Sequence, residues 1–154
     1  MTPREFIWPV RVYWEDTDAG GIVYYANYLK FFERARTEWL RSLGLEQSAL
    51  AAQSALSFVV AEVHLRYAAA ARLDDALQLR LRLVEYGSAS LRLQQQAWRE
   101  QAADAAPLLL CSADVRVGCV HTASLRPARM PGTLRQLLAA WVQGGTANDA
   151  SATA

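Results

Sequence analysis

The sequence predicts a single α+β domain in which one long helix packs against one face of an antiparallel sheet. Residues 27–43 carry apolar side chains at helical spacing, and four later runs alternate apolar and polar residues as strands do. No repeat or linker interrupts residues 6–141. With 154 residues, 53% of them hydrophobic, the chain is long enough to bury one core. We expect the domain to span residues 1–143.

The chain opens with a predicted strand that leads into a loop. Residues 6–14 (FIWPVRVYW) are rich in β-branched and aromatic side chains, which favour strands. Pro9 has no backbone N–H, so we expect this strand at an edge of the sheet or with a bulge. Residues 15–21 (EDTDAGG) follow, and their acids, threonine and paired glycines are typical of a loop with unusual backbone angles.

The long helix follows this loop. Asn27 is a predicted N-cap and Gly44 a predicted C-terminal stop. A short second helix is expected over residues 46–53. The apolar face of the long helix is aromatic, and it contains Tyr28, Phe31, Phe32, Ala35, Trp39 and Leu43.

Four strands are predicted over residues 59–67, 77–83, 91–97 and 111–119. In the first of them, strict alternation places Val59, Ala61 and Val63 on one face, and Val60 and His64 on the other. A short helix is expected over 131–141. The tail, residues 144–154, is small, polar and aperiodic, so we expect it to be disordered.

Composition and charge exclude several classes of protein. The net charge of +1 gives no electrostatic reason to bind nucleic acid. No apolar run has the length of a membrane span, and the N-terminus lacks the apolar region of a signal peptide, so we expect a cytoplasmic protein. Cys111 and Cys119 lie about 26 Å apart along one predicted strand, beyond disulfide reach. We expect two buried, reduced thiols and no metal site.

Two segments carry a resemblance to a known family. Residues 13–28 read YWEDTDAGGIVYYANY, and residues 31–36 read FFERAR. This long motif closely resembles the YbgC branch of the 4-hydroxybenzoyl-CoA thioesterase-like proteins, and the resemblance extends over roughly residues 10–141. It implies a hotdog fold, in which a curled sheet of about five strands wraps the long helix. It also implies a homodimer or homotetramer with active sites at subunit interfaces.

The resemblance implies hydrolysis of an acyl-CoA to free acid and CoA, without metal or cofactor, since coenzyme A is part of the substrate. Asp18 matches the catalytic carboxylate, as nucleophile or as general base on water. The backbone N–H of Tyr25, at the start of the helix, is the expected oxyanion donor. The YbgC branch commonly has His where this chain has Tyr25, whereas the 4-hydroxybenzoyl-CoA enzyme is similar to this chain there. The acyl group of the substrate can therefore still be short-chain, medium-chain or aromatic.

The substrate-binding residues are also carried over from the resemblance. They are Gly20, Gly21, Tyr24, Asn27, Tyr28, Gly87 and Ser88. For Asn27, capping or holding the loop is the competing role, and for the tyrosines it is a place in the core. The turn at residues 86–90 has no Arg or Lys, so the CoA phosphates need cations from elsewhere. The candidates are Arg66, Arg72, Arg126 and Arg129.

Other functions stay open at this stage. The thioester donor is CoA or acyl carrier protein, and the fold alone also allows a non-catalytic acyl-CoA-binding protein. In a hotdog dehydratase we expect a catalytic His near the Asp18 loop. His64 and His121 both lie outside that motif, and we predict both on the surface. Asp18 alone is also compatible with a residue that merely caps a turn.

Overall fold

The computed structural model describes residues 3–144. Residues 145–154 of the predicted disordered tail lie outside this range. In chain order the elements are β1 (Glu5–Arg11), η1 (Trp14–Asp16), α1 (Asn27–Ser42), α2 (Gln47–Ser54), β2 (Leu56–Tyr67), β3 (Ala76–Tyr86), β4 (Ser90–Arg99), β5 (Leu108–His121) and α3 (Gly132–Gln143).

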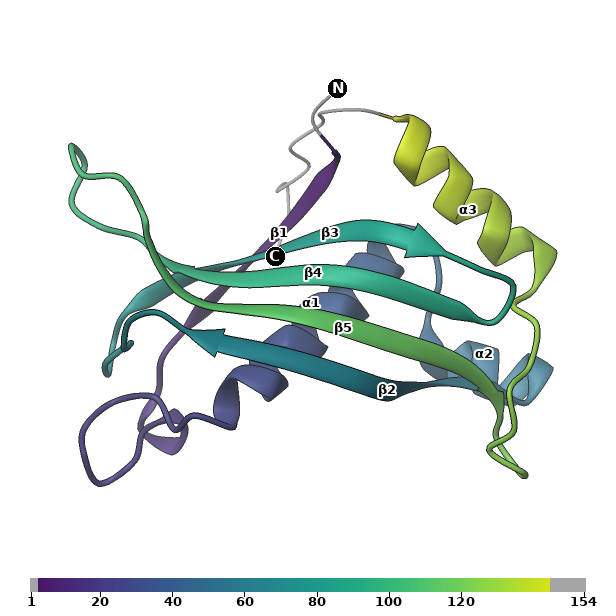
Figure 1. The fold of residues 1–154 in the computed structure, drawn as a ribbon, viewed down its shortest axis with the longest axis horizontal. Coiled ribbons are helices and arrows are strands. Elements are labelled where there is room, and N and C mark those ends of the chain that lie inside the picture. The colour runs from purple at the N-terminus through teal and green to yellow at the C-terminus, as the bar shows by residue number, and fades with distance from the viewer. Residues whose placement is uncertain (1–2, 145–154) are drawn as a thin grey trace.

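The five strands form one antiparallel sheet in the order β1-β3-β4-β5-β2. The helix α1 runs behind the sheet in the view of Figure 1, and α3 lies above the right-hand part of the sheet, near the turn between β3 and β4. This arrangement confirms the predicted α+β architecture. β1, which contains Pro9, lies at one edge as expected, and β2 lies at the other.

The aromatic face of α1 is the centre of the core. Phe31, Phe32 and Trp39 are fully buried, and they pack with inward-facing leucines of β3 and β4. One polar side chain, Gln95, is buried among them. Its Nε2 donates to the Phe32 carbonyl at 2.9 Å, and its Oε1 accepts from Arg36 at 3.0 Å, so both ends of the amide are satisfied.

The two ends of α1 differ from one another in how well the sequence predicts them. Gly44 has φ of +90° immediately after the last turn, which confirms it as the stop. The prediction that Asn27 is the N-cap is wrong, because Ala26 occupies that position and makes no side-chain cap. Asn27 lies inside the first turn instead, where its side chain is buried and bonded to Asp16.

The strict alternation predicted for β2 is wrong at one point. A bulge lies between Val60 and Glu62, so that Val60 pairs with Val117 and Val63 pairs with Val115. Because paired residues share a face, the extra residue places Val60 on the same face as Val63, toward α1. The physical reason is the one-residue insertion at Ala61, which changes the parity of the strand.

Both cysteines lie inside β5, and both are buried and unpaired, as predicted. Burial raises the pKa of the Cys111 thiol to about 12 and also raises that of Cys119. The two histidines, His64 and His121, are exposed, which confirms their predicted surface positions.

The thiols are expected to be inert in the folded protein. With a pKa of about 12, about one Cys111 in 10⁴ is a thiolate at pH 8, and the thiolate is the reactive form. A chromogenic disulfide reagent should therefore react very slowly with native protein and label both cysteines within minutes in guanidinium chloride. Rapid labelling of Cys111 in the native state would contradict this environment.

Candidate active site

The loop between η1 and α1 is closed by its own backbone hydrogen bonds. The N–H of Asp18 donates to the Ile22 carbonyl at 2.9 Å, and the N–H of Tyr24 donates to the Asp16 carbonyl at 2.9 Å. Val23 also bonds through its N–H to the carbonyl of Ala71, at 2.9 Å. The loop is thus a narrow ribbon attached to the segment between β2 and β3.

Asp16 holds this ribbon against the helix. Its carboxylate is 3% exposed, and it accepts the Tyr13 N–H at 2.8 Å and the Asn27 Nδ2 at 2.9 Å. These bonds give Asp16 a loop-stabilising role. Asn27 was also predicted to bind substrate, but its side chain is buried and engaged with Asp16, so its position is that of a loop anchor.

Asp18 lies at the exposed tip of the ribbon. Its Oδ1 accepts the N–H of Gly20 at 2.8 Å, which makes a tight Asx turn. A Cβ on Gly20 would lie 3.1 Å from that oxygen, closer than most real contacts, so this position favours glycine. Gly21 has φ of +79°, which only glycine adopts freely. The two glycines therefore fix where the carboxylate points.

Free backbone donors lie at the start of α1. The N–H of Asn27 donates to the Tyr24 carbonyl at 2.8 Å, and that of Leu29 donates to the Ala26 carbonyl at 3.1 Å. Within residues 3–144, the N–H groups of Tyr25 and Ala26 have no acceptor. Both are at the positive end of the helix dipole, where developing negative charge is favoured.

An apolar cleft of about 330 Å³ opens beside these donors. The side chain of Tyr28 is buried in its wall, whereas Tyr25 is 63% exposed. Tyr24 is exposed and does not line this cleft. Tyr67, at the end of β2, donates its hydroxyl to the Tyr25 carbonyl at 2.8 Å. The cleft is lined by Ile22, Val23, Tyr25, Tyr28, Tyr67, Ala68, Ala69 and Ala70.

Gly87 and Ser88 lie far from Asp18 within one chain. They form the turn after β3, whereas the Asp18 loop lies beside the start of that strand, roughly 35 Å away for its 11 residues (Figure 1). Ser88 accepts the N–H of Met130, which brings the segment of Arg126 and Arg129 to the turn. Two arginines therefore lie in the segment next to a turn that itself has none.

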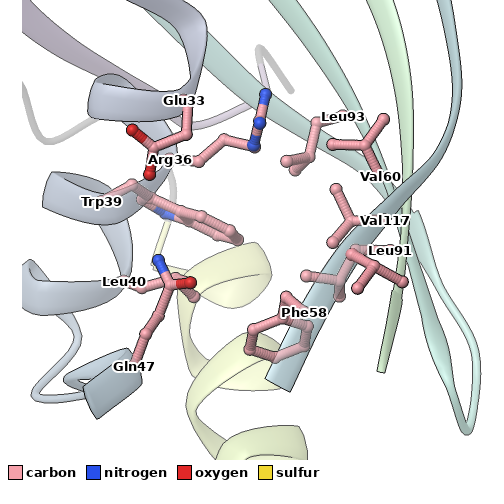
Figure 2. Close-up of a pocket in the computed structure, with 11 residues that line it drawn as sticks. Glu33, Arg36, Trp39, Leu40, Gln47, Phe58, Val60, Leu91, Leu93 and Val117 are labelled. Carbon is pink, nitrogen blue, oxygen red and sulfur yellow. The ribbon is translucent and has the colours of Figure 1, made fainter. Parts of the chain in front are cut away.

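A second cavity, of about 170 Å³, lies between α1 and the sheet near this far end (Figure 2). Arg36 and Trp39 reach it from α1, and Phe58 and Val60 reach it from β2. Burial lowers the pKa of Arg36, with a smaller opposing effect of Glu33. Among residues 3–144, no carboxylate lies within ion-pair distance of that guanidinium.

The free edge of β2 exposes several apolar side chains, between the polar residues Glu62, His64 and Arg66. Val60 is 48% exposed and Tyr67 is also 48% exposed, and Val59 and Val63 are similarly open. In the described part of the chain, β5 is the sole strand that pairs with β2. A long apolar edge of this kind is a surface for pairing with another strand.

Two features are absent from residues 3–144. No helix there is long and apolar enough to cross a membrane. No group of three or more His, Cys, Asp or Glu side chains gathers there as a metal site would require.

Comparison with known proteins identifies the family. The model of the thioesterase-like superfamily matches residues 12–142. The chain belongs to this superfamily. A protein of Haemophilus influenzae named acyl-CoA thioesterase YbgC is 43% identical over 131 residues, which cover 85% of this chain and 92% of that protein. An Escherichia coli protein named acyl-CoA thioester hydrolase YbgC is 42% identical over 134 residues, 87% of this chain and 96% of that protein.

Solved structures of thioesterases share the fold. A probable thioesterase from Bartonella henselae is 30% identical, with a TM-score of 0.74 over 83% of this chain and all of that one. A mutant 4-hydroxybenzoyl CoA thioesterase complexed with 4-hydroxybenzoyl CoA has a TM-score of 0.81 at 19% identity, over 87% of this chain and 98% of that one. The predicted hotdog fold and thioester hydrolase class are confirmed.

Sequence reasoning missed two features of the site. The Tyr67 hydroxyl bond was not foreseen, because Tyr67 and Tyr25 are 42 residues apart and no periodic pattern links them. The pattern of residues 91–97 predicts a strand, but it does not predict the buried hydrogen bonds of Gln95. A glutamine among leucines on that face was the available signal for a buried polar contact.

Asp16 and Asn27 are expected to be coupled in stability. Asp16→Ala should lower the free energy of unfolding by about 2–3 kcal/mol, because it leaves buried donors without an acceptor. In urea titrations the double variant with Asn27→Ala should lose less than the sum of the single losses, by at least about 0.5 kcal/mol. The matched control is Glu15→Ala, an exposed acid in the same turn. If the two losses in unfolding free energy were strictly additive, Asp16 and Asn27 would not be coupled as proposed.

Proposed function

We propose that this protein hydrolyses acyl-CoA thioesters to free acid and CoA at the Asp18 loop. One observation carries the proposal: an exposed carboxylate and two unsatisfied backbone N–H groups lie on one rigid loop beside an apolar cleft. Relatives that are 42–43% identical over most of the chain, and are named for this activity, support it. That the protein lies in the cytoplasm, and that its reaction needs no metal or cofactor, remain predictions.

The chemistry assigns a role to each group. Asp18 attacks the thioester carbonyl to form a mixed anhydride that water then hydrolyses, or it removes a proton from a water that attacks the carbonyl directly. The carbonyl oxygen gains negative charge as the tetrahedral intermediate forms, and the N–H groups of Tyr25 and Ala26 stabilise it. The CoA thiolate is a good leaving group, so its departure needs little acid assistance. Tyr28 and its neighbours in the cleft exclude water from the acyl group.

We further propose that two copies pair through the free edges of β2 to complete the site. In a two-fold antiparallel pair, the end of one β2 that carries Tyr67 lies beside the start of the other. The cleft at Asp18 in one copy then adjoins the cavity of Figure 2 in the other. This arrangement covers the exposed valines Val59, Val60 and Val63 and provides a site at each end of the joined strands.

The same pairing gives a role to the distant turn. The partner's end of the sheet, with Gly87, Ser88, Arg126 and Arg129, faces the Asp18 loop. These residues offer backbone donors and cations to the nucleotide phosphates of CoA. The second candidate donor is a thioester of acyl carrier protein, which the lack of Arg and Lys within residues 86–90 keeps open.

Replacement of Asp18 tests the chemistry. Asp18→Asn should lower kcat on an acyl-CoA panel by at least about 100-fold, because an amide neither attacks nor accepts a proton. The melting temperature should stay within a few degrees, since Asn keeps the acceptor of the turn. Glu15→Gln, the same acid-to-amide change on an exposed neighbour, should keep full activity. Undiminished hydrolysis in Asp18→Asn would rule out the catalytic assignment.

Replacement of Val63 tests the pairing. Val63→Lys puts a charge on the apolar edge, so the variant should sediment as a monomer at micromolar concentration and lose most of its acyl-CoA hydrolysis. Val84→Lys, at a valine 56% exposed on β3, is the matched control and should keep both the assembly and the activity. A fully active monomer would contradict a site shared between copies.

A further inference from the structure

The Tyr67 hydroxyl is the feature of the site that the reaction above does not use. It projects from the end of β2 and donates to the Tyr25 carbonyl at 2.8 Å. The Tyr67 ring packs edge-on against Tyr25, with 6.4 Å between ring centroids, and against Tyr28, with 5.8 Å. The hydroxyl is thus held on its acceptor by contacts on two sides.

The accepting carbonyl is one that α1 leaves free. In a regular helix it would accept the N–H of Leu29, four residues on. That N–H donates to Ala26 instead, at 3.1 Å, because the first turn is tight. The Tyr25 carbonyl therefore points away from the helical hydrogen-bond ladder. Within residues 3–144 its one hydrogen-bond donor is Tyr67.

Peptide planarity links this carbonyl to the catalytic donors. The bond between Tyr25 and Ala26 is trans, so the Tyr25 carbonyl and the Ala26 N–H lie in one plane and point in opposite directions. A hydrogen bond that fixes the carbonyl therefore also fixes the direction of the free Ala26 N–H. Without it the plane can rotate, and a carbonyl oxygen facing the substrate would repel the negative charge that forms there.

We propose that Tyr67 is a positioning residue, which holds the Tyr25–Ala26 peptide in the orientation that directs its N–H at the thioester oxygen. This inference rests on the proposed function. Tyr67 acts through the peptide and is separate from the groups that react. Burial raises the pKa of the Tyr67 hydroxyl, so it stays a proton donor across the physiological range.

The test is Tyr67→Phe, which removes one oxygen and keeps the ring that packs on Tyr25 and Tyr28. We expect kcat on acyl-CoA to fall roughly tenfold, with KM within about twofold, because the donor matters most in the transition state. The melting temperature should change little, since Tyr67 is 48% exposed. Tyr13→Phe, at another exposed tyrosine near the loop, is the matched control and should keep wild-type kcat.

A spectroscopic measurement separates positioning from a general structural effect. An acyl-CoA with a ¹³C-labelled carbonyl, bound to Asp18→Asn, reports hydrogen bonding to the thioester oxygen through its chemical shift. In the double variant with Tyr67→Phe that signal should move toward the value of free acyl-CoA. Unchanged kcat in Tyr67→Phe would overturn the inference, and so would a lower kcat with an unmoved signal.

Failure of the proposed function and failure of the inference would give different experimental results. A wild-type protein that hydrolyses no acyl-CoA would remove the proposed function and the inference with it. An active wild type beside an equally active Tyr67→Phe would remove the inference alone.

Discussion

The site depends on one buried carboxylate. Asp16 binds the chain on both sides of the loop, through the Tyr13 N–H and the Asn27 amide, at a position 3% exposed to solvent. Removing either partner would leave a buried polar group unpaired, which is costly, so the loop has one stable attachment to α1. The exposed tip with Asp18 is thereby held in place by its neighbour two residues earlier. In the proposed reaction, stability and chemistry are thus divided between two aspartates of the same segment.

The sequence predicts most of the fold because each element has a clear local pattern. The aromatic stripe of α1 and the glycine at residue 44 specify a helix and its end, and the alternating strands specify a sheet. The bulge at Ala61 was not predictable, since one inserted residue leaves the apolar content of the strand unchanged. Asn27 failed as a cap because a long-range acceptor, Asp16, competes for its side chain.

Prediction of the site was limited in a different way. The motif places Asp18 and Tyr25 on one loop, because residues seven apart with a glycine turn between them must lie close in space. It gives no information on what comes from elsewhere. The Tyr67 bond crosses 42 residues, and the turn at Gly87 lies at the opposite end of the sheet. Both depend on the packing of the whole sheet, and in the proposed pair the second also depends on how the two copies meet.

The Asx turn at Asp18 has a consequence for the symmetry of its carboxylate. An isolated carboxylate has two equivalent oxygens, but here Oδ1 is occupied by the Gly20 N–H, whereas Oδ2 has no partner among residues 3–144. This hydrogen bond favours the orientation of the group in which Oδ1 faces the backbone and Oδ2 is left free. A glycine that makes the loop tight thus also decides which oxygen of the acid is left without a partner.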